Sequence, residues 1–148
     1  MKGLKLLLIL SISMFAVNLA IANDMNVKAE NMLKDYMNET NQKVKQADMP
    51  EVKRLILNNS LTHLDNVMQE VENMPGVSKD NLAAVQAYRN KVQNKINELN
   101  GKDGYERVPD NQLNAFSNYV MQDLEQADRV LTISLTTALL VVLILLLL

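Results

Sequence analysis

Apolar residues recur at helical spacing in four stretches of the chain, and polar or helix-breaking residues separate these stretches. The first runs from about residue 24 to residue 47 and the second from about 48 to 74, where Met74-Pro75-Gly76 interrupts it. The third ends at Asn100-Gly101, and the fourth starts at Pro109-Asp110 after a polar loop. Apolar side chains three and four positions apart share one face of a helix. The pattern therefore predicts an all-α fold of about four amphipathic helices.

The second stretch carries the most regular seam, in which apolar residues alternate at steps of four and three: Leu57, Leu61, Leu64, Met68 and Val71. This is the spacing of the two core positions of a coiled-coil heptad. Short connections between such helices favour antiparallel neighbours, and therefore an up-down-up-down bundle. The competing architecture is a long hairpin that pairs with a second copy of the chain as a coiled coil.

Arg89 interrupts the otherwise apolar seam of the third stretch, which consists of Leu82, Val85, Val92, Ile96 and Leu99. One interpretation makes Arg89, together with the adjacent Tyr88, a contact for a partner protein. In the other, Tyr88 takes the buried position and Arg89 reaches an acidic residue on another helix. The third stretch is net positive, whereas the second and fourth are net negative, so we expect the third helix to lie between them.

Three residues are predicted to define helix ends. Asp48 is expected to cap the second helix, because its carboxylate can accept hydrogen bonds from the first-turn amides. Ser78 is expected to cap the third helix in the same way. Gly101 is expected to end the third helix, since glycine adopts the left-handed conformation without steric strain.

The N-terminus has the three regions of a secretory signal peptide. Lys2 and Lys5 precede an apolar run over residues 6–17, and small residues stand before Asn23 in Ala20-Ile21-Ala22. The prediction is a signal peptide over 1–22, with an uncleaved N-terminal anchor as the alternative. Both place the body, residues 23–129, outside the cytoplasm.

Residues 130–148 carry no charged side chain, and a helix of that length crosses a hydrocarbon core of roughly 30 Å. We expect a retained single-pass anchor that continues the fourth helix. Its orientation would come from the leader, because no Lys or Arg follows the segment. A removable lipid-anchor signal is the alternative, although it fits the upstream residues poorly. Ser134 and Ala138 form a small-xxx-small pair, which either joins two anchors or arises by chance.

Composition narrows the possible chemistry. The chain of 148 residues has no cysteine, one histidine and a formal net charge of −2. The absence of cysteine excludes disulfides, thiolate metal sites and c-type haem attachment. The acidic balance argues against nucleic acid as a partner. His63 lacks a second histidine for a metal site, and there is little glycine to build a nucleophile elbow, so we expect no catalytic, cofactor-binding or metal-binding residues.

These observations predict a protein of the bacterial inner membrane with its body in the periplasm. The leading hypothesis is a non-enzymatic scaffold or adaptor that acts by contact with an envelope protein or with a second copy of the chain. The alternative is a chaperone-like module whose Met-rich helices bind apolar peptides or lipids. An enzyme with an unfamiliar carboxylate site, and a membrane-disrupting role for the Leu-rich tail, are two further hypotheses.

Overall fold

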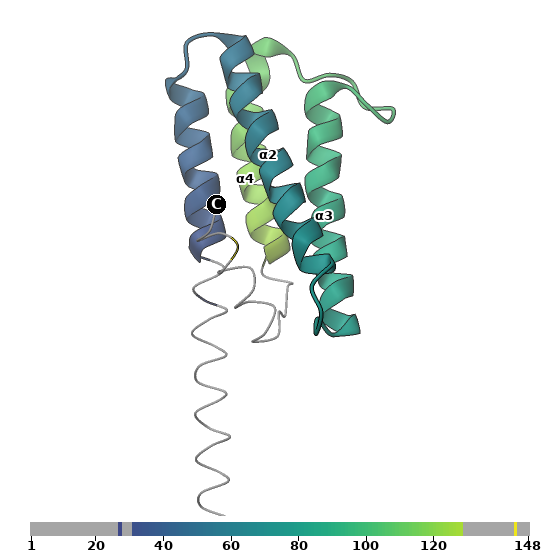
Figure 1. The fold of residues 1–148 in the computed structure, drawn as a ribbon. Coiled ribbons are helices and arrows are strands. Elements are labelled where there is room, and N and C mark those ends of the chain that lie inside the picture. The colour runs from purple at the N-terminus through teal and green to yellow at the C-terminus, as the bar shows by residue number, and fades with distance from the viewer. Residues whose placement is uncertain (1–26, 28–30, 129–143, 145–148) are drawn as a thin grey trace, which may run out of the picture.

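A computed structural model describes residue 27, residues 31–128 and residue 144 of the chain. All regular structure in this part is helical, which confirms the predicted all-α class. The elements are an N-terminal helix that includes residues 31–46, α2 (Pro50–Glu72), α3 (Lys79–Asn100), the 3₁₀ turn η1 (Asp110–Gln112) and α4 (Leu113–Asp128). The four helices pack side by side with alternating direction (Figure 1). A single chain therefore forms a four-helix bundle, and not a long hairpin that would need a second copy to pair with.

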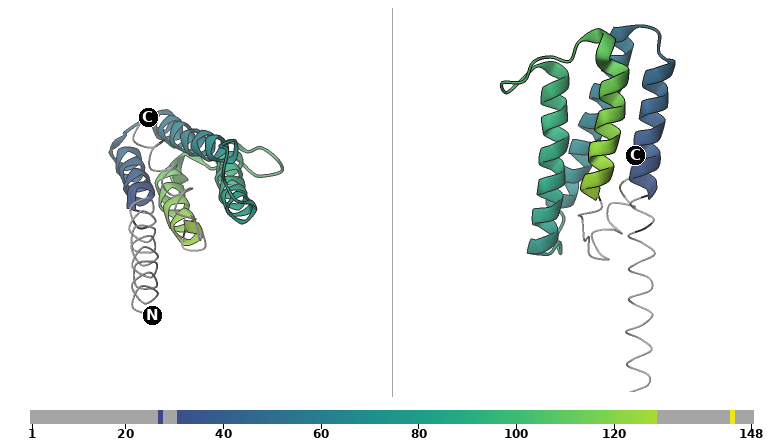
Figure 2. Two further views of the ribbon diagram at one scale, coloured as in Figure 1. Left: turned by 60° about the horizontal axis from the view of Figure 1, so that its bottom comes forward. Right: turned by 180° about the vertical axis from the view of Figure 1, so that it is seen from behind.

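The helices follow one another around the bundle, as the views in Figure 2 show. α3 packs against both α2 and α4, as the charges of the helices predict, but α2 also contacts α4 directly. The start of the N-terminal helix and the end of α4 lie at the same end of the bundle as the α2–α3 turn (Figure 1). The opposite end carries the connection from the N-terminal helix to α2 and the loop from α3 to η1.

The core is mainly aliphatic, and it contains the residues that the seam of the second stretch predicts. Every one of these five α2 residues is buried, and the same core cluster includes four buried residues of α4: Leu113, Phe116, Val120 and Leu124. Burial of one such side chain contributes about 1.5–3 kcal/mol. Ile144, a described residue of the C-terminal segment, belongs to the same core cluster.

A buried polar layer joins the N-terminal helix to its neighbours. The hydroxyl of Thr40 donates to the Ser60 hydroxyl of α2 at 3.0 Å. On the other side, the side-chain amide of Asn41 donates to Asn118 Oδ1 at 3.0 Å and accepts from the Ser117 hydroxyl at 2.9 Å. A buried polar group that loses its partner destabilises the fold by about 1–3 kcal/mol. These paired groups therefore fix how the N-terminal helix sits against α2 and α4.

Two of the three predicted helix ends are confirmed. The Ser78 hydroxyl accepts from the Asn81 amide at 3.4 Å, and Gly101 ends α3 with a φ of 66°. The prediction for Asp48 is wrong, because Met49 occupies the cap position of α2 and makes no side-chain hydrogen bond there. Pro50 begins the helix with its φ already fixed and without an amide hydrogen that needs an acceptor.

The loop after α3 is built from tight turns. The amide of Lys102 donates to Asn97 O at 3.0 Å, which closes the end of the helix in a Schellman-type arrangement. The Tyr105 amide then donates to Lys102 O at 3.1 Å. The two residues between them, Asp103 and Gly104, have φ values of 50° and 84°, as in a type I′ turn. The loop therefore has a defined shape although its tip is exposed.

Substitution of Gly101 by alanine is expected to destabilise the protein by about 1–3 kcal/mol, because two effects add. The left-handed conformation disfavours a side chain, and a Cβ at this position would lie 2.8 Å from both the Cβ and the amide nitrogen of Arg107. Chemical denaturation of the full-length protein in mild detergent measures the loss. Gly104→Ala is the matched control, since its φ is also positive but nothing lies within 4 Å of the added carbon. An equal loss in both variants would contradict the proposed close contact with Arg107.

Candidate functional site

Tyr88 and Arg89, the two residues that the sequence suggests for a partner contact, have different environments. Tyr88 is only 2% exposed and belongs to the core. Arg89 is half-buried at the α2–α3 interface, where its Nε donates to Asp65 at 2.9 Å and its Nη1 to Glu72 at 2.8 Å. The structure thus has the second arrangement, in which Tyr88 is buried and Arg89 pairs with acidic residues on another helix. A partner contact by these residues stays a prediction.

Lys95 is a buried cation that the sequence pattern misses. It is 4% exposed, and its ammonium group lies 3.2 Å from Asp123 on α4 and 3.4 Å from Glu98. The ammonium also donates to the Tyr119 hydroxyl and lies 3.9 Å from the centroid of that ring. Burial opposes the charged form, but the hydrogen bonds to Tyr119 and Asp123 outweigh it, so the pKa of Lys95 lies above its ordinary value. Lys95 therefore stays a cation and ties α3 to α4.

Arg54 organises the end of the bundle at which the α3–η1 loop lies. Its Nη1 donates to Leu99 O at the end of α3, and its Nη2 donates to Val108 O at 2.6 Å and to Asp110 Oδ1 at 2.7 Å. A guanidinium can serve several acceptors at once because its donors form a rigid fork. One α2 side chain thereby holds the end of α3, the last part of the loop and the start of η1 together.

The hydrogen bond from Arg54 holds the pKa of Asp110 below its usual value, and the nearby charge of Arg107 adds to this effect. A carboxylate whose pKa is lower in the folded state stabilises the fold above its ordinary pKa, and this stabilisation is lost as the pH falls through the lowered value. The contribution of Asp110 is therefore fully present near neutral pH.

Asp110→Asn is expected to be less stable than the natural protein by a constant amount above about pH 5. The difference should shrink as the pH falls below about 4, because the natural carboxylate then becomes protonated as well. Urea denaturation of both proteins across this pH range provides the measurement. A difference that stays constant down to the lowest pH would contradict the role of the charge.

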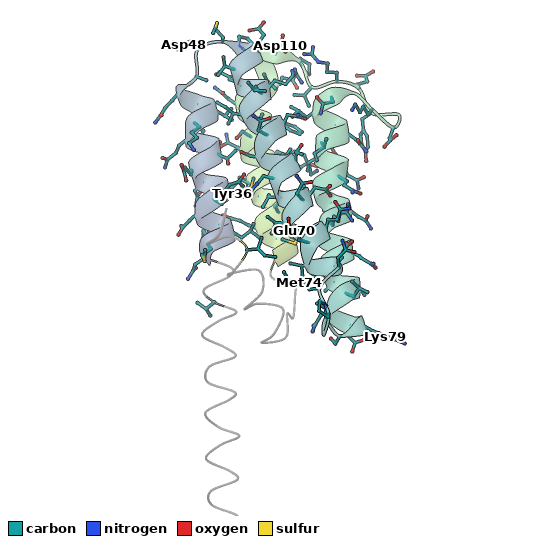
Figure 3. The ribbon with its side chains drawn as sticks, in the orientation of Figure 1. Tyr36, Asp48, Glu70, Met74, Lys79 and Asp110 are labelled. Atoms are coloured by element: carbon teal, nitrogen blue, oxygen red, sulfur yellow. The ribbon has the colours of Figure 1, made fainter. Side chains whose placement is uncertain are left out.

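A shallow cleft of about 290 Å³ lies beside Arg54 at this end of the bundle. Seven residues line it: Glu51, Arg54, Leu55, Asn58, Asn100, Arg107 and Asp110. They come from α2, from the last turn of α3 and from the segment around η1. Figure 3 shows Asp110 at this end of the bundle, with Met74 and Lys79 at the other end. The sequence pattern does not reveal this cleft, because most of its residues are polar and they come from segments far apart along the chain.

His63 is half-buried, and its ring centroid lies 5.6 Å from that of Tyr36. The hydroxyl of Tyr36 donates to Ser60 O at 3.3 Å, so His63 packs against a fixed aromatic ring. Within residues 31–128, no group of three or more histidine, aspartate or glutamate side chains has the spacing to hold a metal ion.

The predicted terminal segments lie almost entirely outside the described residues. This applies to the signal peptide over 1–22, to the anchor over 130–148 apart from Ile144, and to the pair Ser134 and Ala138. Among the helices that the structure does describe, none has both the length and the apolar character needed to cross a membrane. The membrane prediction therefore depends on the sequence of the two ends.

Comparison of the chain with protein-family models, with curated proteins and with solved structures gave no match. The fold defines the protein only as a helical bundle with a structured loop at one end. Its function must accordingly be inferred from the residues themselves.

Proposed function

We propose that this protein is a membrane-anchored scaffold or adaptor whose helical body stands outside the cytoplasm and acts by protein-protein contact. The main support for this proposal is that the two ends of the bundle differ. The start of the N-terminal helix and the end of α4 lie at one end, where the apolar terminal segments would connect (Figure 1). The opposite end holds the structured loop, the cleft and the exposed apolar side chains of Met49 and Leu55.

The ion pairs of the body also support a contact role rather than catalysis. Arg89 and Lys95 each pair with carboxylates on a neighbouring helix, so these charges serve to join helices. A catalytic carboxylate would typically lie in a cleft with a strongly perturbed pKa. Asp110 is the cleft carboxylate with a shifted pKa, and the shift favours the charged form that pairs with Arg54.

The chaperone-like alternative receives less support from the described residues. It requires an accessible apolar groove to which methionine side chains contribute. Met37 and Met68 are instead buried at 3% and 4% exposure, and they belong to the core. Met49 is exposed, but it stands in the connection before α2 rather than in a groove.

Chemical crosslinking followed by affinity purification tests the adaptor proposal. The full-length protein in its native membrane is compared with a variant truncated after Arg129. We expect a defined set of envelope proteins to crosslink to the full-length protein and to be lost on truncation, because the anchor keeps the body near them. Self-crosslinks alone would indicate a homo-oligomer. A broad set of unfolded proteins retained by the truncated form would indicate a chaperone-like binder.

A further inference from the structure

The cleft beside Arg54 has walls that are fixed before any partner binds. Arg54 itself is held by three acceptors from α3, the loop and η1. The side-chain amide of Asn100, at the end of α3, also donates to Asn58 Oδ1 of α2 at 2.9 Å. A surface that is ordered in advance loses less conformational entropy when a partner binds. The cleft is therefore better suited to docking than the flat outer faces of the helices.

The lining combines one exposed apolar side chain with an incompletely neutralised cation. Leu55 is 58% exposed although it lies within a helix. Arg107 is 57% exposed, and its nearest carboxylate oxygen is Asp110 Oδ1 at 3.8 Å. Arg54 lies 2.7 Å from that same oxygen, so Asp110 pairs more closely with Arg54 than with Arg107. The charge of Arg107 is left largely available to a further anionic group.

Glu51 adds a negative charge to the same lining. It forms no ion pair with any other described residue, and it stands in the first turn of α2. Its charge, together with that of Asp110, disfavours a densely anionic ligand such as a nucleic acid or a phosphate-rich surface. A single carboxylate next to an apolar group avoids most of this repulsion, because it needs to approach only Arg107.

We propose that this cleft docks a segment of a partner protein in which an aspartate or glutamate stands next to a large apolar side chain. The apolar side chain covers Leu55, and the carboxylate pairs with Arg107. An arginine can bind a carboxylate through two parallel hydrogen bonds, which gives direction as well as attraction. This inference rests on the proposed adaptor function and identifies the surface that the adaptor would use.

A displayed library of random 12-residue peptides tests the proposal on the full-length protein held in lipid nanodiscs. The library is selected against the natural protein and against two cleft variants, Arg107→Glu and Leu55→Ser. Lys102→Glu is the matched control, because it reverses a charge in the same exposed loop but does not line the cleft. Circular dichroism establishes that each variant keeps its helical content.

We expect the natural protein and Lys102→Glu to select peptides with an acidic residue beside a large apolar one. Arg107→Glu should bind these peptides about tenfold or more weakly and should select basic residues instead. Leu55→Ser should lose the apolar preference. Selection of the same peptides by all four proteins, or no enrichment on the natural protein, would overturn the docking proposal. Neither result would affect the adaptor function, since envelope partners could still crosslink to another face of the full-length protein.

Discussion

Tyr88→Ala is expected to lower the free energy of unfolding by about 3–5 kcal/mol, the usual loss when a buried aromatic side chain is removed from a core. Tyr88 is among the largest fully buried side chains of the described bundle, and it packs in the cluster that joins the helices. A loss of this size is a large part of the stability of a small domain. Urea denaturation of the full-length protein in mild detergent measures it.

Two variants make this result specific. Tyr105→Ala removes the same side chain from the exposed loop, where Tyr105 is 40% exposed, and should change stability by less than about 1 kcal/mol. Tyr88→Phe retains the ring and should keep most of the stability. If Tyr88→Ala left stability unchanged but weakened crosslinking to a partner, Tyr88 would be a surface contact and its place in the core would be wrong.

Arg89→Ala is expected to lower the free energy of unfolding by about 2–4 kcal/mol, because it leaves Asp65 and Glu72 without their shared partner at a half-buried helix interface. Removing one member of a buried ion pair typically destabilises more than the net value of the pair, since the remaining charge stays poorly solvated. The triple variant Arg89→Met, Asp65→Asn, Glu72→Gln should recover part of the loss, because it removes the charges together.

Lys43→Ala provides the control for a surface ion pair. Lys43 pairs with Glu39 at 2.7 Å within one exposed helix face, and both side chains are more than half exposed. Such an exposed pair contributes little to stability, because water and salt screen it. Comparable losses in Lys43→Ala and Arg89→Ala would show that the Arg89 pairs contribute no more than surface pairs, contrary to the expected result.

The bundle could be predicted from the sequence where hydrophobicity alone selects the buried face. In α2, the five seam residues are all buried because no polar side chain competes for their positions. In α3, the pattern placed Leu82 and Ile96 on the seam, but both are only half-buried. Val85, Val92 and Leu99 are buried as predicted, and Tyr88 is buried as the second interpretation of Arg89 had it, whereas the burial of Asn81 and Lys95 was not predicted.

The reason for this error is that partners on other helices decide which polar residues can be buried. Lys95 is tolerated inside because Asp123 and Tyr119 of α4 neutralise and bind its ammonium group. Ile96 is half-buried against the core and still packs on it. A hydrophobic pattern within one helix contains no information about carboxylates on another.

The cleft residues were unpredictable for a related reason. Arg54 looks like an ordinary exposed residue of an amphipathic helix, and its acceptors come from Leu99, Val108 and Asp110, more than forty positions along the chain. Gly101 was a local signal at this end, since a glycine after a helix indicates a left-handed turn. The sequence located the loop, but only the packing of α2 against it revealed the cleft.

Membrane fractionation combined with protease accessibility tests the anchored arrangement most directly. The full-length protein is produced in a bacterium with an inner and an outer membrane, and the outer membrane is then opened. We predict that the full-length protein stays in the pellet after alkaline extraction and that external protease digests its body, whereas the variant truncated after Arg129 is released. Full-length protein in the soluble fraction would contradict the anchor. It would indicate that the C-terminal segment packs on the bundle instead, an arrangement consistent with the burial of Ile144.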